Sequence, residues 1–173
     1  MRLLTFELIG SEGEPTIGSI LQDASGGIVV SEASDRVHGY AAYGHSRRAA
    51  LQPLIDHFAI PLFDDGERLR TPAASLAEVE DDELGCGVES ESVPRIERVQ
   101  TSASTLPKTL ALTYYDPSRD YQTGQMRAFA AASFGIDEAE ELPVAIAADK
   151  AKALAESRIA RGWAQRDKLV LRM

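Results

Sequence analysis

The segment 116–122 carries the residues whose types and spacing could do chemistry. Asp116 and Asp120, with Arg119 beside them, could act as acid and base or offer carboxylate oxygens to a divalent cation. The same residues also fit a turn, because an Asp side chain accepts backbone hydrogen bonds and Pro117 presets the backbone angle. We therefore interpret the two carboxylates as parts of a turn between strands and not as catalytic groups.

Tyrosines flank this turn at positions 114, 115 and 121. Tyrosine offers amphipathic contact area that is enriched at protein interfaces, but tyrosines on alternate faces of a strand are equally typical of ordinary core and rim packing. Both interpretations stay open. The hypothesis for this segment is a contact between subunits, made by Tyr114, Tyr115, Asp116, Arg119, Asp120, Tyr121 and Gln122.

Other reactive residue types do not form a recognisable motif. His38, His45 and His57 lack the spacing of zinc ligands, no serine lies in a Gly-x-Ser-x-Gly elbow, and no glycine group is followed by the Lys-Ser or Lys-Thr pair of a phosphate loop. Cys86 is the single cysteine, so an internal disulfide is impossible. The sequence predicts no catalytic residue, no metal site and no cofactor.

Composition limits the class of protein and its partners. The chain has 173 residues, of which 44% are hydrophobic, enough for one core or for two small halves that share an interface. A net charge of −9 opposes binding to nucleic acid or to an anionic membrane. Neither a secretory signal nor an apolar run of about 20 residues is present, so we expect a soluble protein that folds in a reducing cytosol.

The first half of the chain alternates between strand and helix patterns. Thr16 and Ser46 are typical N-caps, the Gly26-Gly27 pair ends the first helix, and Pro53 should bend the second helix or displace its start. Asp-Asp-Gly-Glu at 64–67 predicts a tight hairpin. The predicted elements are strands at 3–9, 28–31 and 37–43, helices at 16–24 and 47–58, and hairpin arms at 61–63 and 68–70.

An acidic stretch separates this half from the rest. Seven acidic residues and no basic one lie between positions 78 and 91, so their repulsion favours a solvated connector. We predict a first half at 1–77, a connector at 78–94 and a second half at 95–173. The second half should hold a β-meander at 95–101, 108–115 and 126–134, a strand at 143–147, a helix capped by Asp149 with a stripe at 151, 154, 155, 159 and 163, and a strand at 168–173.

These elements predict an α+β fold. Its sheets should be mixed but mostly antiparallel, or partial barrels, with two or three packed helices. The order strand, helix, turn and strand over 37–70 recurs over 144–173, which indicates two related halves.

Two stretches resemble a known family. They are VHGYAAYGHSRRAALQPLIDHFAIPLFDDGERLR at 37–70 and LPKTLALTYYDPSRDYQTGQMRA at 106–128. The second is more specific, since Leu-Pro, a strand, Tyr-x-Asp-Pro and Asp-Tyr-Gln follow one another. The Ala-rich helix at 147–167 is similar too. Over roughly residues 16–173 the chain resembles the phage tail protein family found in the large host-specificity or "megatron" proteins of siphophage-like tails and gene transfer agents.

The resemblance implies a structural segment of a baseplate hub, in which mixed β domains with packed helices form a trimer at the distal end of the tail tube. It implies other tail proteins as partners, a homotrimer in the tail but a possible monomer in isolation, and a place in the virion tail after synthesis in the bacterial cytoplasm. It assigns no catalytic residue to this region. Family members are usually longer, often with a glycosidase-like barrel upstream, so we expect an excised domain, a short relative or a prophage remnant.

Two other functions are weighed against this one. A small tail-associated glycan hydrolase would use Asp116, Asp120 and an acid from 137–141, with two carboxyl groups facing each other at about 5–9.5 Å across a groove. An adaptor would bind a basic partner through the acidic connector, and salt would weaken that binding.

Overall fold

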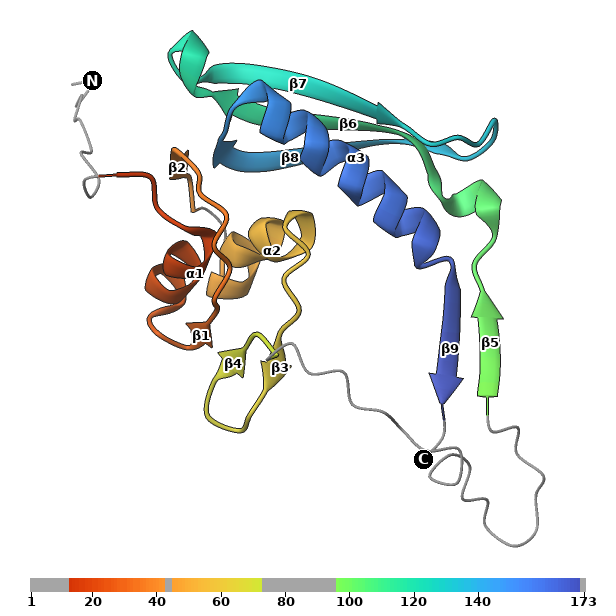
Figure 1. Cartoon of the computed structure of the whole chain (residues 1–173), viewed down its shortest axis with the longest axis horizontal. Coiled ribbons are helices and arrows are strands. Elements are labelled where there is room, and N and C mark those ends of the chain that lie inside the picture. The colour runs from red at the N-terminus through yellow and green to blue at the C-terminus, as the bar shows by residue number, and fades with distance from the viewer. Residues whose placement is uncertain (1–12, 43–44, 73–95, 172–173) are drawn as a thin grey trace, which may run out of the picture.

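The computed structural model describes residues 13–42, 45–72 and 96–171, with three α-helices and nine strands in these ranges (Figure 1). The strand predicted at 3–9 and the acidic connector lie outside the described residues. The helices are α1 (Ile17–Ser25), α2 (Arg47–His57) and α3 (Ala148–Ala164). The strands are β1 (Val29–Val30), β2 (Gly39–Tyr40), β3 (Phe63–Asp64), β4 (Leu69–Arg70), β5 (Ile96–Gln100), β6 (Pro107–Asp116), β7 (Gln122–Phe129), β8 (Ile136–Ala145) and β9 (Asp167–Leu171).

The largest sheet has the strand order β2-β8-β6-β7. β6 and β7 form the predicted hairpin, antiparallel from Thr109 opposite Phe129 to Asp116 opposite Gln122. β8 lies on the other side of β6 and runs parallel to it, and β2 adds an antiparallel edge. The predicted meander is therefore wrong in two respects: its first strand, β5, lies outside this sheet, and its third strand is β7 at Gln122–Phe129 and not 126–134. The strand after β7 crosses to the far side of β6.

The crossing is tight where the chain passes the start of β6. Gly135 has a φ of 131°, and a Cβ added there would lie 2.5 Å from the carbonyl oxygen of Leu106. The amide of Ile136 donates to that same oxygen at 2.9 Å. Glycine at this position lets the connection approach closely, so that β8 can begin directly beside β6.

One face of the sheet is covered by α3, which lies across β6 and β7 (Figure 1). Its buried residues are Ala151, Ala155 and Ile159, at the i, i+4 and i+8 spacing that faces one neighbour. The helix was predicted correctly, but its cap was not. The N-cap is Ala147, which makes no side-chain capping bond, and Asp149 lies in the first turn.

The N-terminal helices begin where their caps predict. The side chains of Thr16 and Ser46 accept hydrogen bonds from the amides of Ser19 and Ala49, at 3.1 Å each. Gly26 ends α1 in the left-handed conformation. α2 starts at Arg47 and continues through Pro53, so its predicted displaced start is not observed.

Two smaller sheets complete the fold. In the first, β4 pairs antiparallel with β3 in the predicted hairpin and parallel with β1. In the second, β5 and β9 pair only with each other, antiparallel over five residues. This pair, called the β5–β9 ribbon below, extends away from the main sheet (Figure 1).

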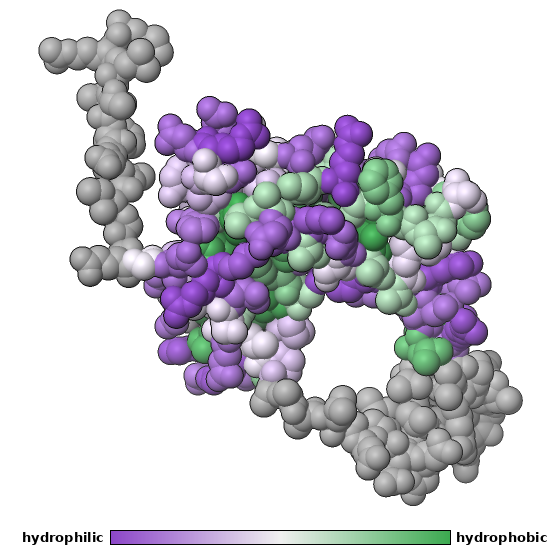
Figure 2. Space-filling model, turned by 45° about the horizontal axis from the view of Figure 1, so that its top comes forward, coloured by the Kyte–Doolittle hydropathy of each residue, from purple (hydrophilic) through white to green (hydrophobic). Residues whose placement is uncertain are grey.

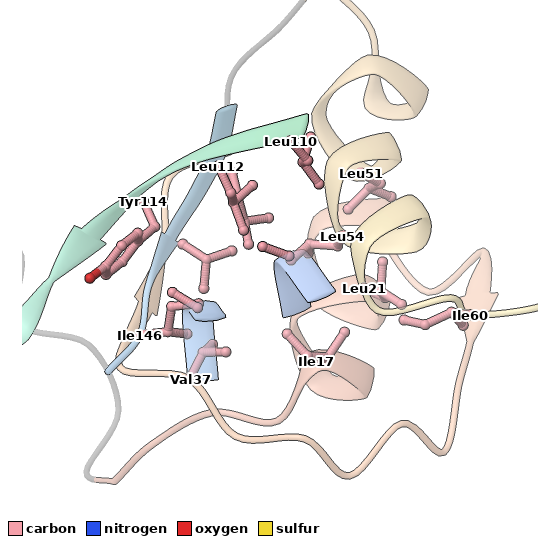
Figure 3. Close-up of a cluster of buried hydrophobic side chains, with 14 of the residues drawn as sticks. Ile17, Leu21, Val37, Leu51, Leu54, Ile60, Leu110, Leu112, Tyr114 and Ile146 are labelled. Carbon is pink, nitrogen blue, oxygen red and sulfur yellow. The ribbon is translucent and has the colours of Figure 1, made fainter. Parts of the chain in front are cut away.

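Both predicted halves contribute to one hydrophobic core. Figure 3 shows Ile17 and Leu21 of α1 and Leu54 of α2 converging on Leu110 and Leu112 of β6. The predicted α+β class is confirmed, and no sheet of the described ranges closes into a barrel. The domain boundaries and the relation between the halves stay predictions.

Candidate functional site

The turn between β6 and β7 is built by Asp116. Its Oδ1 accepts hydrogen bonds from the amide of Ser118 at 3.0 Å and from the Ser118 hydroxyl at 2.7 Å, which starts a short 3-10 helix over Pro117–Arg119. Its carbonyl oxygen accepts the amide of Tyr121 at 3.0 Å. The carboxylate of Asp116, a candidate acid or base in the sequence, thus accepts hydrogen bonds that stabilise the turn.

Tyr114 fixes the base of the same turn from inside. Its side chain is buried, and its ring lies over Gly124, its cross-strand partner, where a Cβ would come within 2.7 Å of the ring. Figure 3 shows its hydroxyl directed away from the other labelled side chains. Burial raises the pKa of Tyr114, the charge of Asp116 raises it further, and Arg119 opposes both effects.

The tip of the turn is exposed and strained. Arg119, Asp120, Tyr121 and Gln122 are all exposed, with 55% of Tyr121 accessible. Asp120 and Tyr121 have φ values of 55° and 57°; Asp tolerates this left-handed conformation in turns, whereas for Tyr121 it costs about 1–2 kcal/mol. Strain of this kind persists only where the surrounding structure imposes it, and it is concentrated at functional sites.

The structure therefore divides the seven residues predicted as an interface. Tyr114 and Asp116 are buried and Tyr115 is half-buried, so these three support the turn. The four exposed residues form the surface that a partner could reach. Whether a partner binds there stays a prediction.

The geometry required for glycan hydrolysis is not met by Asp116 and Asp120. Asp116 is buried and Asp120 is exposed. Neither side chain lines the four hollows that lie around α2, α3 and the end of β7 in the described part of the chain. Glu141 lies beside Thr113, three residues before Asp116, which is about 10 Å along a strand. Because side chains alternate along a strand, Glu141 and Asp116 also lie on opposite faces of the sheet.

A partly buried polar cluster, called the polar clamp below, joins three elements that the sequence analysis did not bring together. It consists of His57 on α2, Glu140 on β8 and Arg158 and Arg161 on α3. The His57 Nε2 and Glu140 Oε2 atoms are 3.0 Å apart, with 6% and 18% of the two side chains exposed. Arg158 donates to Glu140 Oε1 at 2.9 Å.

The contacts of the clamp favour the charged form of Glu140. The His57 Nδ1 atom is 2.8 Å from the carbonyl oxygen of Pro53, which can only accept, so this nitrogen carries a proton. The pKa of Glu140 is lowered, first by its hydrogen bond with His57 and then by Arg158, although burial acts in the opposite direction. Glu140 is therefore an anion held by groups on both helices.

Arg161 ties the end of α2 to α3. It donates to the carbonyl oxygens of Asp56 and His57 at 2.8 and 3.2 Å, where the last turn of α2 leaves acceptors without helical partners. Burial, followed by the charge of Arg158, lowers the pKa of Arg161. The clamp thus fastens a helix from the first half to a strand and a helix from the second.

The sequence did contain a signal for His57. Leu51 and Leu54 mark the buried face of α2, and His57 continues the same three-residue spacing. A histidine at a buried helix position needs polar partners. The spacing could have shown that His57 is buried, but not that its partner would be Glu140, 83 positions further along the chain.

Two kinds of feature are absent from the described part of the chain. Within it, no three or more His, Cys, Asp and Glu side chains are grouped so as to hold a metal ion. None of its helices combines the length and apolar character needed to cross a membrane.

Two solved structures share this fold. The structure matches a chain described as "Virion of native gene transfer agent (GTA) particle" with a TM-score of 0.76 and 22% identity, over 89% of this chain and 37% of that one. It also matches the tail protein from Neisseria meningitidis MC58 with a TM-score of 0.55 and 10% identity, over 90% of this chain and 50% of that one. The chain thus spans half or less of the length of either relative.

The sequence itself shows the family. Residues 46–173 match the model of the family described as "Putative phage tail protein", which covers most of the chain, and the chain belongs to this family. A structural role in a phage tail follows from that membership. No curated protein matches the chain.

Proposed function

We propose that the chain is a structural component of the baseplate hub of a phage, prophage or gene transfer agent tail, where it mediates contacts between subunits and assembly of the tail tip. Support comes from the family match over 46–173 and from the shared fold with a chain of a gene transfer agent virion. In this proposal the chain has no enzymatic activity, its partners are other tail proteins and two further copies of itself, and it resides in the virion tail after synthesis in the bacterial cytoplasm.

The observation that carries the proposal is the strained, exposed tip of the β6–β7 turn. The buried pair Tyr114 and Gly124 and the capping carboxylate of Asp116 hold the backbone from below. Tyr121 is thus exposed to solvent on a backbone that is already fixed. Binding of a partner would therefore cost little further conformational entropy at this residue. Exposed aromatic residues on a rigid base are typical of positions that dominate protein interfaces.

The partner proposed for this tip is another subunit of the hub, in a closed arrangement of three copies. β7 is an edge strand of the described sheet and lies directly after the turn. An edge strand presents unpaired backbone groups that favour pairing, and a closed ring of identical copies protects such edges. The turn and the edge form one continuous surface available to a neighbour.

A substitution in assembled tails tests this proposal. We expect Tyr121→Ala to weaken the contact about tenfold or more, as truncation of a central aromatic usually does. The measurement is chemical crosslinking between copies of the chain in tails, together with the number of intact particles. Phe63→Ala is the matched control, because Phe63 is an exposed aromatic on β3, outside the turn. Crosslinking of Tyr121→Ala equal to that of wild type would remove the turn from the interface.

A further inference from the structure

A hollow of about 370 Å³, called the α2 hollow below, lies between α2 and the small sheet that contains β1 and β4 (Figure 1). Leu51 of α2 and Val29 of β1 are buried, whereas Ile28 is 46% exposed. The volume is at the lower end of the range for ligand pockets, about 300–1,000 Å³. The apolar walls are formed by Ile28, Val29, Leu51, Ile55, Leu62 and Leu69.

The charged residues that line the α2 hollow are two neighbouring arginines. Arg47 and Arg48 line it together with Ser25 and Gln52, and no acidic side chain of the described residues does so. The Nη1 atom of Arg47 donates to the carbonyl oxygen of Ser25 at 3.0 Å, which holds this guanidinium beside the hollow. Neither arginine forms an ion pair with a described residue. The hollow therefore combines apolar walls with two positive charges.

The position of these arginines in the helix is unfavourable without an anion. They are the first two residues of α2, and the first turn contains no acidic residue. The first amide groups of a helix have no helical acceptor and give this end a partial positive charge, which disfavours cations. α3 has Asp149 in its first turn instead. Residues that break a local rule in this way are expected at functional sites.

The acidic side chains of the neighbouring elements do not neutralise the two arginines by contact. None of them lines the α2 hollow or forms an ion pair with either arginine. Asp56 instead accepts a hydrogen bond from Gln52 Nε2 at 2.8 Å, and Asp65 pairs with Arg70. The acids of α1, α2 and the β3–β4 hairpin are Asp23, Asp56, Asp64, Asp65 and Glu67.

Apolar exposure alone does not mark a binding site on this chain. On the face shown in Figure 2, hydrophobic residues reach the surface between charged ones. The α2 hollow differs because the charges in its lining are all positive, in a chain with a net charge of −9. A ligand that carries an apolar group next to an anion is complementary to both the walls and the arginines.

We propose that the α2 hollow binds an acidic peptide of another tail protein, with an apolar side chain of the peptide in the hollow and a flanking carboxylate on Arg48. The inference rests on the proposed function, which supplies other tail proteins as partners. A guanidinium offers a planar set of donors that matches a carboxylate, and arginine is enriched among residues that dominate interfaces. The Arg48 side chain makes no hydrogen bond with a described residue, so its donors are available.

A peptide array tests the specificity. The full chain is applied to immobilised heptapeptides Ser-Gly-Z-X-Z-Gly-Ser, in which X is Phe, Leu or Ser and both Z positions are Glu, Gln or Lys. Acids on both sides of X make the result independent of peptide direction. We expect peptides with Glu around Phe or Leu to retain at least about tenfold more protein than those with Lys around Phe or Glu around Ser. Equal retention of these peptides would overturn the proposal.

A charge reversal tests the assigned arginine. Arg48→Glu should lower retention on the Glu-Phe-Glu peptide about tenfold and raise it on Lys-Phe-Lys. The variant should fold, because an acid is favourable at the start of a helix. Arg127→Glu, at an exposed arginine of β7, is the matched control and should bind like wild type. Equal losses in the two variants would show that overall charge and not the α2 hollow holds the peptide, which contradicts the proposal.

A polar substitution tests the apolar part of the contact. Ile28→Ser should lower retention on Glu-Phe-Glu about fivefold, because roughly half of this side chain is left to be buried by a ligand. Val99→Ser is the matched control, since Val99 is 45% exposed but lies on β5. Unchanged binding by Ile28→Ser would show that the peptide does not enter the hollow.

Two other occupants would overturn the peptide assignment. Dodecanoate that displaces the Glu-Phe-Glu peptide at an equal or lower concentration would assign the hollow to a lipid-like anion. Self-association of the wild-type chain in sedimentation equilibrium, lost in Arg48→Glu but kept in Arg127→Glu, would assign it to a second copy.

This inference and the proposed function fail in distinguishable ways. If the array shows no preference while Tyr121→Ala still disrupts assembled tails, the peptide site is wrong and the hub function stands. If the array and its variants respond as expected while Tyr121→Ala tails assemble normally, the subunit contact at the turn is wrong and the peptide site stands. If neither responds, both are wrong.

Discussion

The polar clamp and the β5–β9 ribbon show two ways of joining distant parts of one chain. The clamp joins α2, β8 and α3 through half-buried charges and helix-end carbonyls. The ribbon joins positions 96–100 to 167–171 through backbone bonds and one exposed ion pair, Arg98 with Asp167 at 3.0 Å. The clamp packs against several elements of the chain, whereas the two strands of the ribbon pair mainly with each other.

The largest difference in the free energy of unfolding is expected between two Leu→Ala substitutions, one in each region. Leu112→Ala removes a fully buried side chain of β6 beneath the clamp and should lower the free energy of unfolding by about 2–5 kcal/mol. Leu169→Ala removes an exposed side chain of the ribbon and should change it by less than about 0.5 kcal/mol. Urea unfolding of the two variants measures both values. Similar losses would show that the ribbon is part of the core.

A smaller effect is expected from Glu140→Gln, which breaks the clamp. It should cost about 1–3 kcal/mol at pH 7, because His57 and Arg158 would keep buried donors without a charged acceptor. Glu141→Gln is the matched control, since Glu141 is its exposed neighbour. Equal stability of the two variants would contradict a stabilising role for the clamp.

The loss of stability in Glu140→Gln should depend on pH. The pKa of Glu140 is lowered on folding, so its stabilising contribution is complete above the ordinary value of 4.5 and is lost as the pH falls through the lower folded value. The difference in unfolding free energy between wild type and Glu140→Gln should therefore shrink as the pH falls below about 4.5. A difference that grows in acid would reverse the assigned sign.

The smallest effect is expected in the ribbon. The pKa of Asp167 is lowered, first by its hydrogen bond with Arg98, but both side chains are exposed, at 40% for Asp167 and 63% for Arg98. Exposed pairs of this kind contribute little and are screened by salt. Asp167→Asn should leave the thermal unfolding midpoint unchanged at low and at high salt. A clear drop at low salt would show that the pair holds the chain together.

Local signals predicted local structure. Thr16, Ser46 and the Gly26-Gly27 pair set the ends of helices, and Asp-Asp-Gly-Glu formed the predicted hairpin, because each acts on neighbours a few residues away. The β6–β7 hairpin was predicted for the same reason. These elements place the candidate turn, and its sequence of Asp, Pro and Ser indicated its structural role.

Long-range pairing was the part that the sequence could not supply. The parallel register of β6 with β8 and the pairing of β5 with β9 depend on which distant strand offers a matching edge. The start of β8 was also missed, since its polar first half lacks the alternation of a half-buried strand. Asp149 was wrong as a cap because helix α3 begins before it, at Ala148.

The pairing of β2 with β8 has a consequence for how the protein is made. Tyr40 lies opposite Val144, so roughly a hundred residues must be synthesised before this edge of the sheet can form. Synthesis proceeds at about 5–20 residues per second, so the apolar faces of α1 and α2 stay exposed for roughly 5–20 s before the main sheet can pack against them. That delay makes the early chain a natural client for chaperones that shield nascent hydrophobic helices.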